Sequence, residues 1–112
     1  MEITKKEQSL IFNIGDVTAH EYPSKNKDIS GGYVEIKGRH PAEGWICNQD
    51  CTELVFISRG SVTLTTDQGS FVLNELDQVI IEPKERYYWD GDCVAFVPST
   101  PPWTLEQTKI EK

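Results

Sequence analysis

The stretch CNQDCTELVFISRG, residues 47–60, leads from a polar segment through the acidic residue Glu53 into an apolar strand that ends at Gly60. Similar short runs of β-branched and aromatic residues recur along the chain, separated by Gly, Pro, Asn and Asp, which is the pattern of strands and turns. Segments with helical periodicity are scarce. The sequence therefore predicts an all-β chain.

Two turns support this interpretation, because Asp67-Gln68-Gly69 and Asp90-Gly91-Asp92 each place a glycine where a hairpin needs a positive φ. Antiparallel strands of this number and length fit a jelly-roll β-barrel in a single domain, and closure of the barrel removes exposed strand edges. The predicted strands cover residues 9–14, 33–37, 45–51, 54–58, 61–66, 70–73, 78–82, 86–90 and 93–98. The residues expected to be buried or between sheets include Val62, Leu64, Val79, Ile81 and Phe96.

The charge balance excludes two classes of partner. Eighteen acidic residues against eleven basic ones give a net charge of −7, which repels nucleic-acid phosphates and anionic lipid. No segment approaches the roughly 20 apolar residues that span a bilayer, and the first residues lack the apolar run of a signal peptide. We expect a cytoplasmic protein that binds neither nucleic acid nor membranes.

The three cysteines, Cys47, Cys51 and Cys93, are expected to be reduced. Their C-x-x-x-C spacing is neither a redox motif nor half of a zinc knuckle. Free cysteine is commonly a small buried hydrophobic residue, which is the interpretation we prefer here. A catalytic thiol stays open for Cys47 alone.

The opening stretch resembles the first cupin motif, G-x5-H-x-H-x3,4-E-x6-G, because Glu53 is followed by six residues and then Gly60. In the shorter spacing of that motif the two histidine positions fall on Cys47 and Gln49. In the longer spacing they fall on Ile46 and Asn48. Neither alternative contains a histidine.

The stretch LDQVIIEPKERYYWDGD, residues 76–92, is similar in outline to the second cupin motif, G-x5-P-x-G-x2-H-x3-N. Its histidine position falls on Tyr87 if Asp77 is aligned with the aspartate that follows the first glycine, and on Tyr88 if Pro83 is the motif proline. We prefer Tyr87, because Trp89 then faces inward with it.

Three further stretches, GRHP, YYW and PPWTLEQ, also resemble a subset of small bacterial cupins of undefined activity. The motif-bearing barrel covers about residues 33–98, and residues 98–112 form an extended tail. Trp103 in this tail needs cover from the same barrel or from a second subunit, and small cupins often pair, so we expect a homodimer. The loop at residues 22–32, rich in Pro, Lys, Asn and Gly, is predicted to be mobile over one end of the barrel.

The resemblance places the odd-numbered residues of strand 45–51 inside the barrel with Glu53, because side chains of equal parity share one face of a strand. Such an interior is polar at points and has aromatic walls, which suits an uncharged or hydroxyl-rich small molecule. The predicted site consists of Glu53 and Tyr87 as tentative catalytic residues, and of Trp45, Cys47, Gln49, Cys51, Tyr88 and Trp89 as ligand-binding residues.

The resemblance implies a metal held by three imidazoles and one carboxylate, of which only the carboxylate of Glu53 is present. One carboxylate with an amide or a thiolate is a poor ligand set for a transition metal, so we expect no metal and no cofactor. His20 and His40 lie outside both motifs and are predicted to be surface or loop residues.

Two functions remain open. In the first, the metal-free barrel binds a small polar metabolite, such as a sugar or a carboxylate, without reacting with it. In the second, the protein is a metal-independent enzyme like the sugar isomerases and epimerases, in which Glu53 and Tyr87 transfer protons. In the enzyme, Glu53 would be a general base with a raised pKa. In the binding protein, Glu53 would be a buried acid bonded to a tyrosine hydroxyl.

Overall fold

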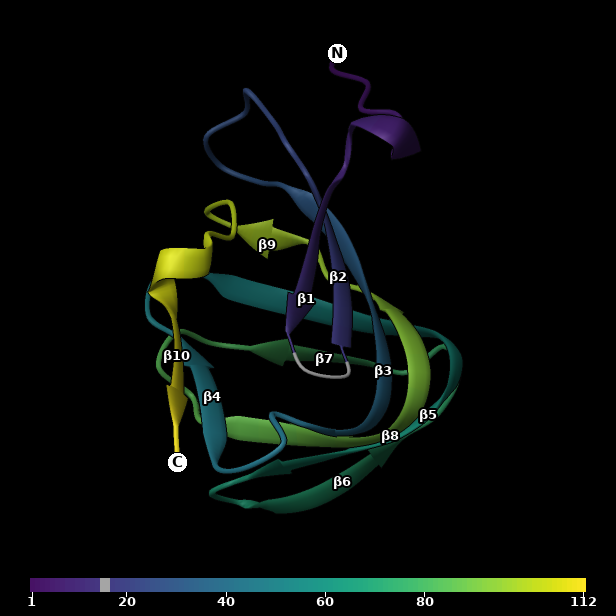
Figure 1. Cartoon of the computed structure of the whole chain (residues 1–112), viewed down its shortest axis with the longest axis vertical. Helices are drawn as coiled ribbons and strands as arrows, with labels where there is room; N and C mark the ends of the chain where they lie inside the picture. The colour runs from purple at the N-terminus through teal and green to yellow at the C-terminus, as the bar shows by residue number, and fades with distance from the viewer. Residues whose placement is uncertain (15–16) are drawn as a thin grey trace.

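The computed structural model describes residues 1–14 and 17–112, and nearly all of its regular structure is antiparallel β-sheet (Figure 1). The strands are β1 (Leu10–Ile14), β2 (Val17–Tyr22), β3 (Gly31–His40), β4 (Trp45–Asn48), β5 (Thr52–Thr66), β6 (Gly69–Leu73), β7 (Gln78–Ile81), β8 (Tyr87–Phe96), β9 (Ser99–Thr100) and β10 (Thr108–Glu111). Two single-turn 3₁₀ helices, Lys6–Gln8 and Leu105–Gln107, complete the described elements. The all-β prediction is confirmed.

Strands β5 and β8 form the centre of the sheet. They pair along almost their whole length, and the other strands join the sheet through them. Strand β8 also pairs with β3 and β4, and β5 also pairs with β6, β7 and β9. Strands β1 and β2 extend the sheet beyond β3, and β10 extends it beyond β4. Figure 1 shows β3, β5 and β8 curving strongly, so that the sheet wraps around an interior.

A β-bulge in β5 produces part of this curvature. The pairing with β8 shifts between Ile57 and Arg59, and Gly60 follows with φ of 83°. A Cβ atom at Gly60 would collide with the carbonyl oxygen of Asp92 in β8, so only glycine allows the two backbones to approach here. The bulge also changes parity: the inward residues are Val55 and Ile57 before it, and Val62 and Leu64 after it.

The predicted strand pattern is correct in type but wrong in several boundaries. Residues 54–58 and 61–66 belong to the single strand β5, and Asp90-Gly91-Asp92 lies within β8 and makes no hairpin. The reason is that Gly91 pairs with Val62 and keeps the ladder continuous. The other predicted hairpin is confirmed, because Thr66 pairs with Gly69 across a two-residue turn. Strands β2, β9 and β10 were not predicted.

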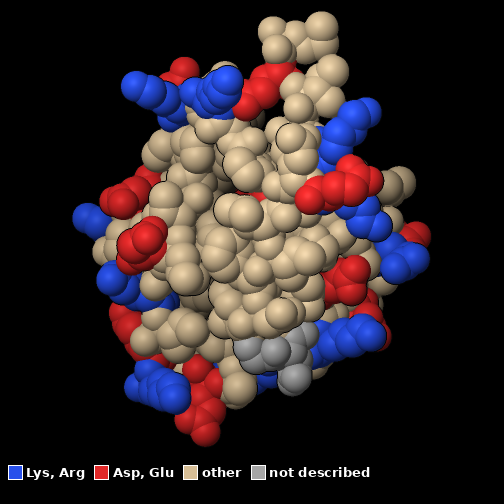
Figure 2. All heavy atoms as spheres, turned by 45° about the horizontal axis from the view of Figure 1, so that its top comes forward, with Lys and Arg blue, Asp and Glu red and all other residues tan. Residues whose placement is uncertain are grey.

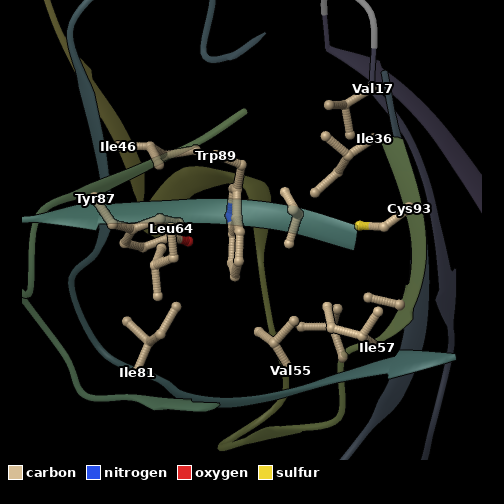
Figure 3. Packing of buried hydrophobic residues seen from close by; sticks show 13 residues of the cluster. Val17, Ile36, Ile46, Val55, Ile57, Leu64, Ile81, Tyr87, Trp89 and Cys93 are labelled. Atoms are coloured by element: carbon tan, nitrogen blue, oxygen red, sulfur yellow. The ribbon is translucent and has the colours of Figure 1, made fainter. Parts of the chain in front are cut away.

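The hydrophobic core fills the interior of the curled sheet (Figure 3). Trp89 stands in the middle of it, with Tyr87 and Leu64 on one side and Ile36 and Ile57 on the other. Of the predicted core residues, Val62, Leu64 and Ile81 are buried and Val79 packs against the cluster. Phe96 is 55% exposed, which corrects the prediction; Ala95 and Val97 take the inward positions at that end of β8.

The three cysteines are free and buried, as the sequence predicts. Burial raises the pKa of the Cys51 thiol to about 12 and that of Cys93 to about 11. These two thiols are therefore protonated and act as packing groups.

The loop between β2 and β3 extends from the same end of the molecule as the N-terminal residues (Figure 1). The Glu2 carboxylate accepts hydrogen bonds from the Ser24 hydroxyl and the Lys25 backbone N–H, which ties the loop to the N-terminal segment. Within the described ranges, no helix is long and apolar enough to cross a membrane.

Candidate functional site

The interior of the curled sheet contains a cavity of about 70 Å³ near β2, β4 and β10. Its walls are mostly aliphatic and aromatic, with Ile46, Val55 and Trp89 among them. A few polar side chains converge in this apolar lining, which is the usual composition of a small-molecule site. The polar lining residues are Glu21, His40, Asn48, Glu53, Tyr87 and Thr108.

Glu53 lies at the centre of the polar group. Its side chain is 8% exposed, and its Oε1 atom accepts hydrogen bonds from Asn48 Nδ2 at 2.7 Å and from the Tyr87 hydroxyl at 3.2 Å. Strands β4, β5 and β8 supply these three residues. Both bonds end on the same oxygen, and no hydrogen bond among the described residues reaches Oε2. One carboxylate oxygen is therefore held and the other is available.

A chain of hydrogen bonds continues from Asn48 toward the C-terminal segment. Thr108 Oγ1 donates to Asn48 Oδ1 at 2.8 Å, and the Trp103 indole N–H donates to Thr108 Oγ1 at 2.9 Å. In each hydrogen bond of this series, a donor faces an acceptor. The indole of Trp103 is thus connected to the carboxylate of Glu53 through two intermediate side chains.

Burial raises the pKa of Glu53 to about 7, although the hydrogen bonds from Tyr87 and Asn48 lower it in part. Burial also raises the pKa of the Tyr87 hydroxyl well above its usual value, and the nearby charge of Glu53 adds to this shift. At neutral pH, Glu53 is therefore present in both protonation states while Tyr87 stays neutral and donates a proton in its hydrogen bond.

Glu21, at the end of β2, is a second carboxyl group in the cavity lining and was missed from the sequence. Burial raises the pKa of Glu21 to about 8, and repulsion from Glu53 contributes to the shift. Its paired residue on β3 is Gly32, where a Cβ atom would lie only 2.9 Å from Glu21 Oε2. The glycine makes room for the carboxyl group. Parity with Val17 and Ala19 was the signal for an inward Glu21.

His40 is a second residue that the sequence prediction misplaced. It ends β3 with an exposed fraction of 8% and lines the cavity, whereas we expected a surface or loop residue. Burial lowers the pKa of its imidazole, so the ring is neutral near pH 7. His20 does face away from the cavity lining; its ring stacks on Tyr33 at 4.2 Å.

The predicted parity of strand 45–51 is wrong. Ile46 and Asn48 line the cavity with Glu53, whereas Cys47, Gln49 and Cys51 are not among the described residues that line it. The reason is a bend at Gln49 and Asp50, which changes the inward face between β4 and β5. Gln107 Oε1 stabilises this bend by accepting the backbone N–H groups of Asp50 and Cys51. The longer motif spacing, with Ile46 and Asn48 at the histidine positions, is therefore the one that matches the structure.

Trp45 and Tyr88, both predicted to bind the ligand, lie on the outer side of the sheet. Their rings meet edge to face at 5.2 Å, and the guanidinium groups of Arg39 and Arg86 lie 3.8 Å from the Tyr88 ring and 5.1 Å from the Trp45 ring. These four side chains form a cation–π row. Their strand positions alternate with the inward ones, which explains why neither ring lines the cavity. Trp89 does line it.

The cavity does not fit the metal that cupin barrels commonly hold. The positions equivalent to the three imidazoles carry Ile46, Asn48 and Tyr87, and the Glu53 oxygen nearest to them is already bonded to Asn48 and Tyr87. Within residues 1–14 and 17–112, no cluster of three His, Cys, Asp or Glu side chains is arranged to hold a metal ion. That the site functions without a metal remains a prediction.

The curled antiparallel sheet of this chain has the fold of a cupin-type barrel. Several solved structures share it. Pac13 from Streptomyces, a nucleoside dehydratase, superposes with a TM-score of 0.87 at 12% identity, covering 100% of this chain and 92% of that one. KdgF from a Halomonas species superposes with a TM-score of 0.71 at 9% identity, covering 92% of this chain and 96% of that one.

An RmlC-like cupin from Shewanella frigidimarina also superposes, with a TM-score of 0.71 at 16% identity and 95% coverage of both chains. No family model and no curated protein matches the chain. At these identities the similarity establishes the fold, and the reaction has to be argued from the cavity itself.

Proposed function

We propose that this protein is a metal-independent acid–base enzyme that binds a small hydroxylated molecule in the barrel and removes a proton from one of its carbon atoms. One observation carries the proposal: Glu53 is buried beside a cavity, with Oε1 held by Asn48 and Tyr87 and with Oε2 unbonded among the described residues. A general base needs this arrangement, in which one oxygen fixes the orientation and the other accepts the proton.

The reaction begins when Glu53 Oε2 takes a proton from a carbon next to a carbonyl group. The electron pair of the broken C–H bond moves toward the carbonyl oxygen and gives an enolate. In a dehydration, the enolate expels the hydroxyl group of the next carbon, which takes the proton back from Glu53 and leaves as water. In an isomerisation of an α-hydroxy carbonyl compound, the hydroxyl proton moves to the former carbonyl oxygen, and Glu53 returns its proton to the former carbonyl carbon. Both reactions need the same first step, and neither consumes an oxidant.

The raised pKa of Glu53, about 7, supports this role, because a general base is most efficient when its pKa lies near the working pH. The similar structures add support of their own. Pac13 is called a nucleoside dehydratase, and it has been solved with uridine in variants that change tyrosine to phenylalanine or histidine to glutamine. The present cavity contains a tyrosine and a histidine beside its carboxyl groups.

Binding without chemistry is the second candidate, because a buried carboxyl group held by Asn48 and Tyr87 can also anchor a ligand hydroxyl through Oε2. If Glu53 only anchors a ligand hydroxyl, its removal changes affinity and no rate. The two candidates therefore differ in what Glu53→Gln does.

Solvent exchange tests the proposal. The purified protein is incubated in D₂O with nucleosides, nucleoside aldehydes, aldoses and ketoses, and deuterium incorporation and loss of water are followed by NMR. Glu53→Gln should reduce exchange and turnover by roughly 10²-fold or more, because the variant keeps the shape and loses the base. Glu35→Gln, the same change at an exposed position of β3, is the control and should have no effect. Ligand binding without exchange in the wild type would leave the binding candidate.

The expectations of a cytoplasmic homodimer remain predictions. Light scattering after size exclusion gives the mass of the particle and decides between 12.7 kDa and twice that value.

A further inference from the structure

A second hollow lies on the outer side of the cavity, between β1, the end of β2 and the segment that follows β9. This outer groove has a volume of about 400 Å³ and is lined by, among others, Leu10, Phe12, Tyr22, Pro102 and Leu105. Glu21 and Trp103 line both the outer groove and the inner cavity. One carboxyl group and one indole therefore stand at the boundary between the two hollows.

We propose that the inner cavity and the outer groove form one site with two compartments, which takes an uncharged molecule made of a flat ring joined to a small hydroxylated group. The ring lies in the outer groove against Trp103, and the hydroxylated group enters the inner cavity next to Glu53. The proposal rests on the proposed function, and it adds the class of the ligand and the residues that select it.

Size is the first argument. The inner cavity alone has room for only a small fragment, whereas the outer groove lies within the range of volumes common for small-molecule sites. A ligand that occupies both places its reacting group at the carboxylate and its larger part outside. Glu21 and Trp103, which belong to both linings, mark the boundary at which the two parts of the ligand are joined.

The chemistry of the groove selects the ring. Phe12 meets Trp103 edge to face at 5.4 Å and supports the indole, and aliphatic and proline side chains complete an apolar surface of the kind on which flat rings stack. The hydroxyl of Thr104, which also lines the groove, accepts a hydrogen bond from Gln107 Nε2 and keeps its own proton for a polar atom of the ring.

Charge selects against phosphorylated ligands. The described residues that line the two compartments include Glu21, Glu53 and Glu106, and none of them is Lys or Arg. Because the pKa values of Glu21 and Glu53 are raised to about 8 and about 7, these two carboxyl groups are only partly charged near pH 7. A phosphate or carboxylate would still lose its hydration without a cation to pair with it. On the face turned forward in Figure 2, the charged side chains lie mostly around the rim and the middle is uncharged. The site therefore favours a nucleoside over a nucleotide, and a neutral glycoside over a sugar phosphate.

The hydrogen-bond chain connects the two compartments. Trp103 donates to Thr108, Thr108 donates to Asn48, and Asn48 donates to Glu53. A ring that fixes Trp103 in the groove thereby also restrains the orientation of the Glu53 carboxylate, so binding in the outer compartment prepares the inner one.

Binding measurements on the full chain test this inference. Calorimetry and saturation-transfer NMR are run with unphosphorylated nucleosides and aryl glycosides, with their separate ring and sugar halves, and with the corresponding 5′-phosphates. We expect a two-part compound to bind at least tenfold more tightly than either half and than its phosphate. The variant Leu10→Glu, at a groove position that is 53% exposed, should weaken the two-part compound about tenfold and leave the sugar half unchanged.

The control is Ile11→Glu, on the same strand, at a position that is 59% exposed and outside the groove lining; it should not change binding. The inference is overturned if no two-part compound binds, if phosphates bind as tightly, or if Leu10→Glu and Ile11→Glu act alike. Turnover is measured in parallel and separates the two proposals. If Leu10→Glu weakens binding but the wild type shows no solvent exchange, only the proposed function is refuted. If the wild type shows solvent exchange and Leu10→Glu does not reduce it, only the two-compartment site is refuted.

Discussion

Tyr87 and Tyr88 are neighbours in sequence and experience opposite environments. The Tyr87 hydroxyl is buried and donates to Glu53, and it belongs to the polar group of the cavity. Tyr88 is half-buried on the outer side, where Arg39 lies over its ring. The same residue type contributes a buried proton donor on one face and a cation-binding surface on the other. Position on the strand, rather than residue type, therefore decides which aromatic groups belong to the site.

Substitutions of the two tryptophans on these faces should differ most in their effect on the stability of the protein. Trp89→Ala removes a large side chain from the middle of the core and should lower the free energy of unfolding by about 3–5 kcal/mol. Trp45→Ala removes a half-buried ring of the cation–π row and should cost about 1 kcal/mol. Urea unfolding followed by circular dichroism measures both. Equal losses would break the distinction between the inner and the outer face.

The pH dependence of stability should show the buried carboxyl of Glu53. Its pKa is about 7 in the folded protein and near 4.5 in the unfolded chain, so between these values the folded state binds more protons. Stability is then full below about pH 4.5 and declines as pH rises to about 7, by on the order of 3 kcal/mol from this residue. Glu21, with its pKa of about 8, extends the decline in the same direction.

The Glu53→Gln variant isolates this contribution. Buried His40 acts in the opposite direction, because its lowered pKa makes stability rise with pH below its usual titration range. The wild type minus Glu53→Gln difference cancels the effect of His40 and should itself decline from pH 5 to pH 8 in thermal unfolding. Glu35→Gln, an exposed change, should behave like the wild type. A flat difference would show that Glu53 is not buried as the structure has it.

The smallest expected effects come from removing the hydroxyl group of Tyr87 or of Tyr88. Tyr87→Phe removes a donor to Glu53 and should cost about 1 kcal/mol and raise the pKa of that carboxyl further, since its hydrogen bond lowers it. Tyr88→Phe keeps the ring under Arg39 and should change stability by less than about 0.5 kcal/mol. Chemical denaturation and the pH profile of exchange measure both changes. A larger cost for Tyr88→Phe would reverse the comparison.

Local patterns in the sequence were enough to predict the class of the fold. Alternation in residues 61–66, the turn Asp67-Gln68-Gly69 and the spacing from Glu53 to Gly60 depend on neighbours within a few residues, and the structure has an antiparallel sheet with a hairpin at that turn. The inward position of Tyr87 was expected from the resemblance to the second cupin motif, and parity along the strand added Trp89 to the same face. These inferences held because strand geometry alternates with a period of two.

The composition of the site was decided by long-range contacts. Gln107 holds the bend at Asp50 from 57 residues away, and this bend turns Asn48 inward and Cys47 away from the cavity. Glu21 lies on β2, which was not predicted because several of its residues are polar. Its inward position depends on pairing with Gly32 of β3. Through its resemblance to the first cupin motif, the sequence determined that a carboxylate, Glu53, faces the interior of a barrel. Only the tertiary structure determined which groups surround it, because a single bend or bulge reverses the parity of every residue that follows.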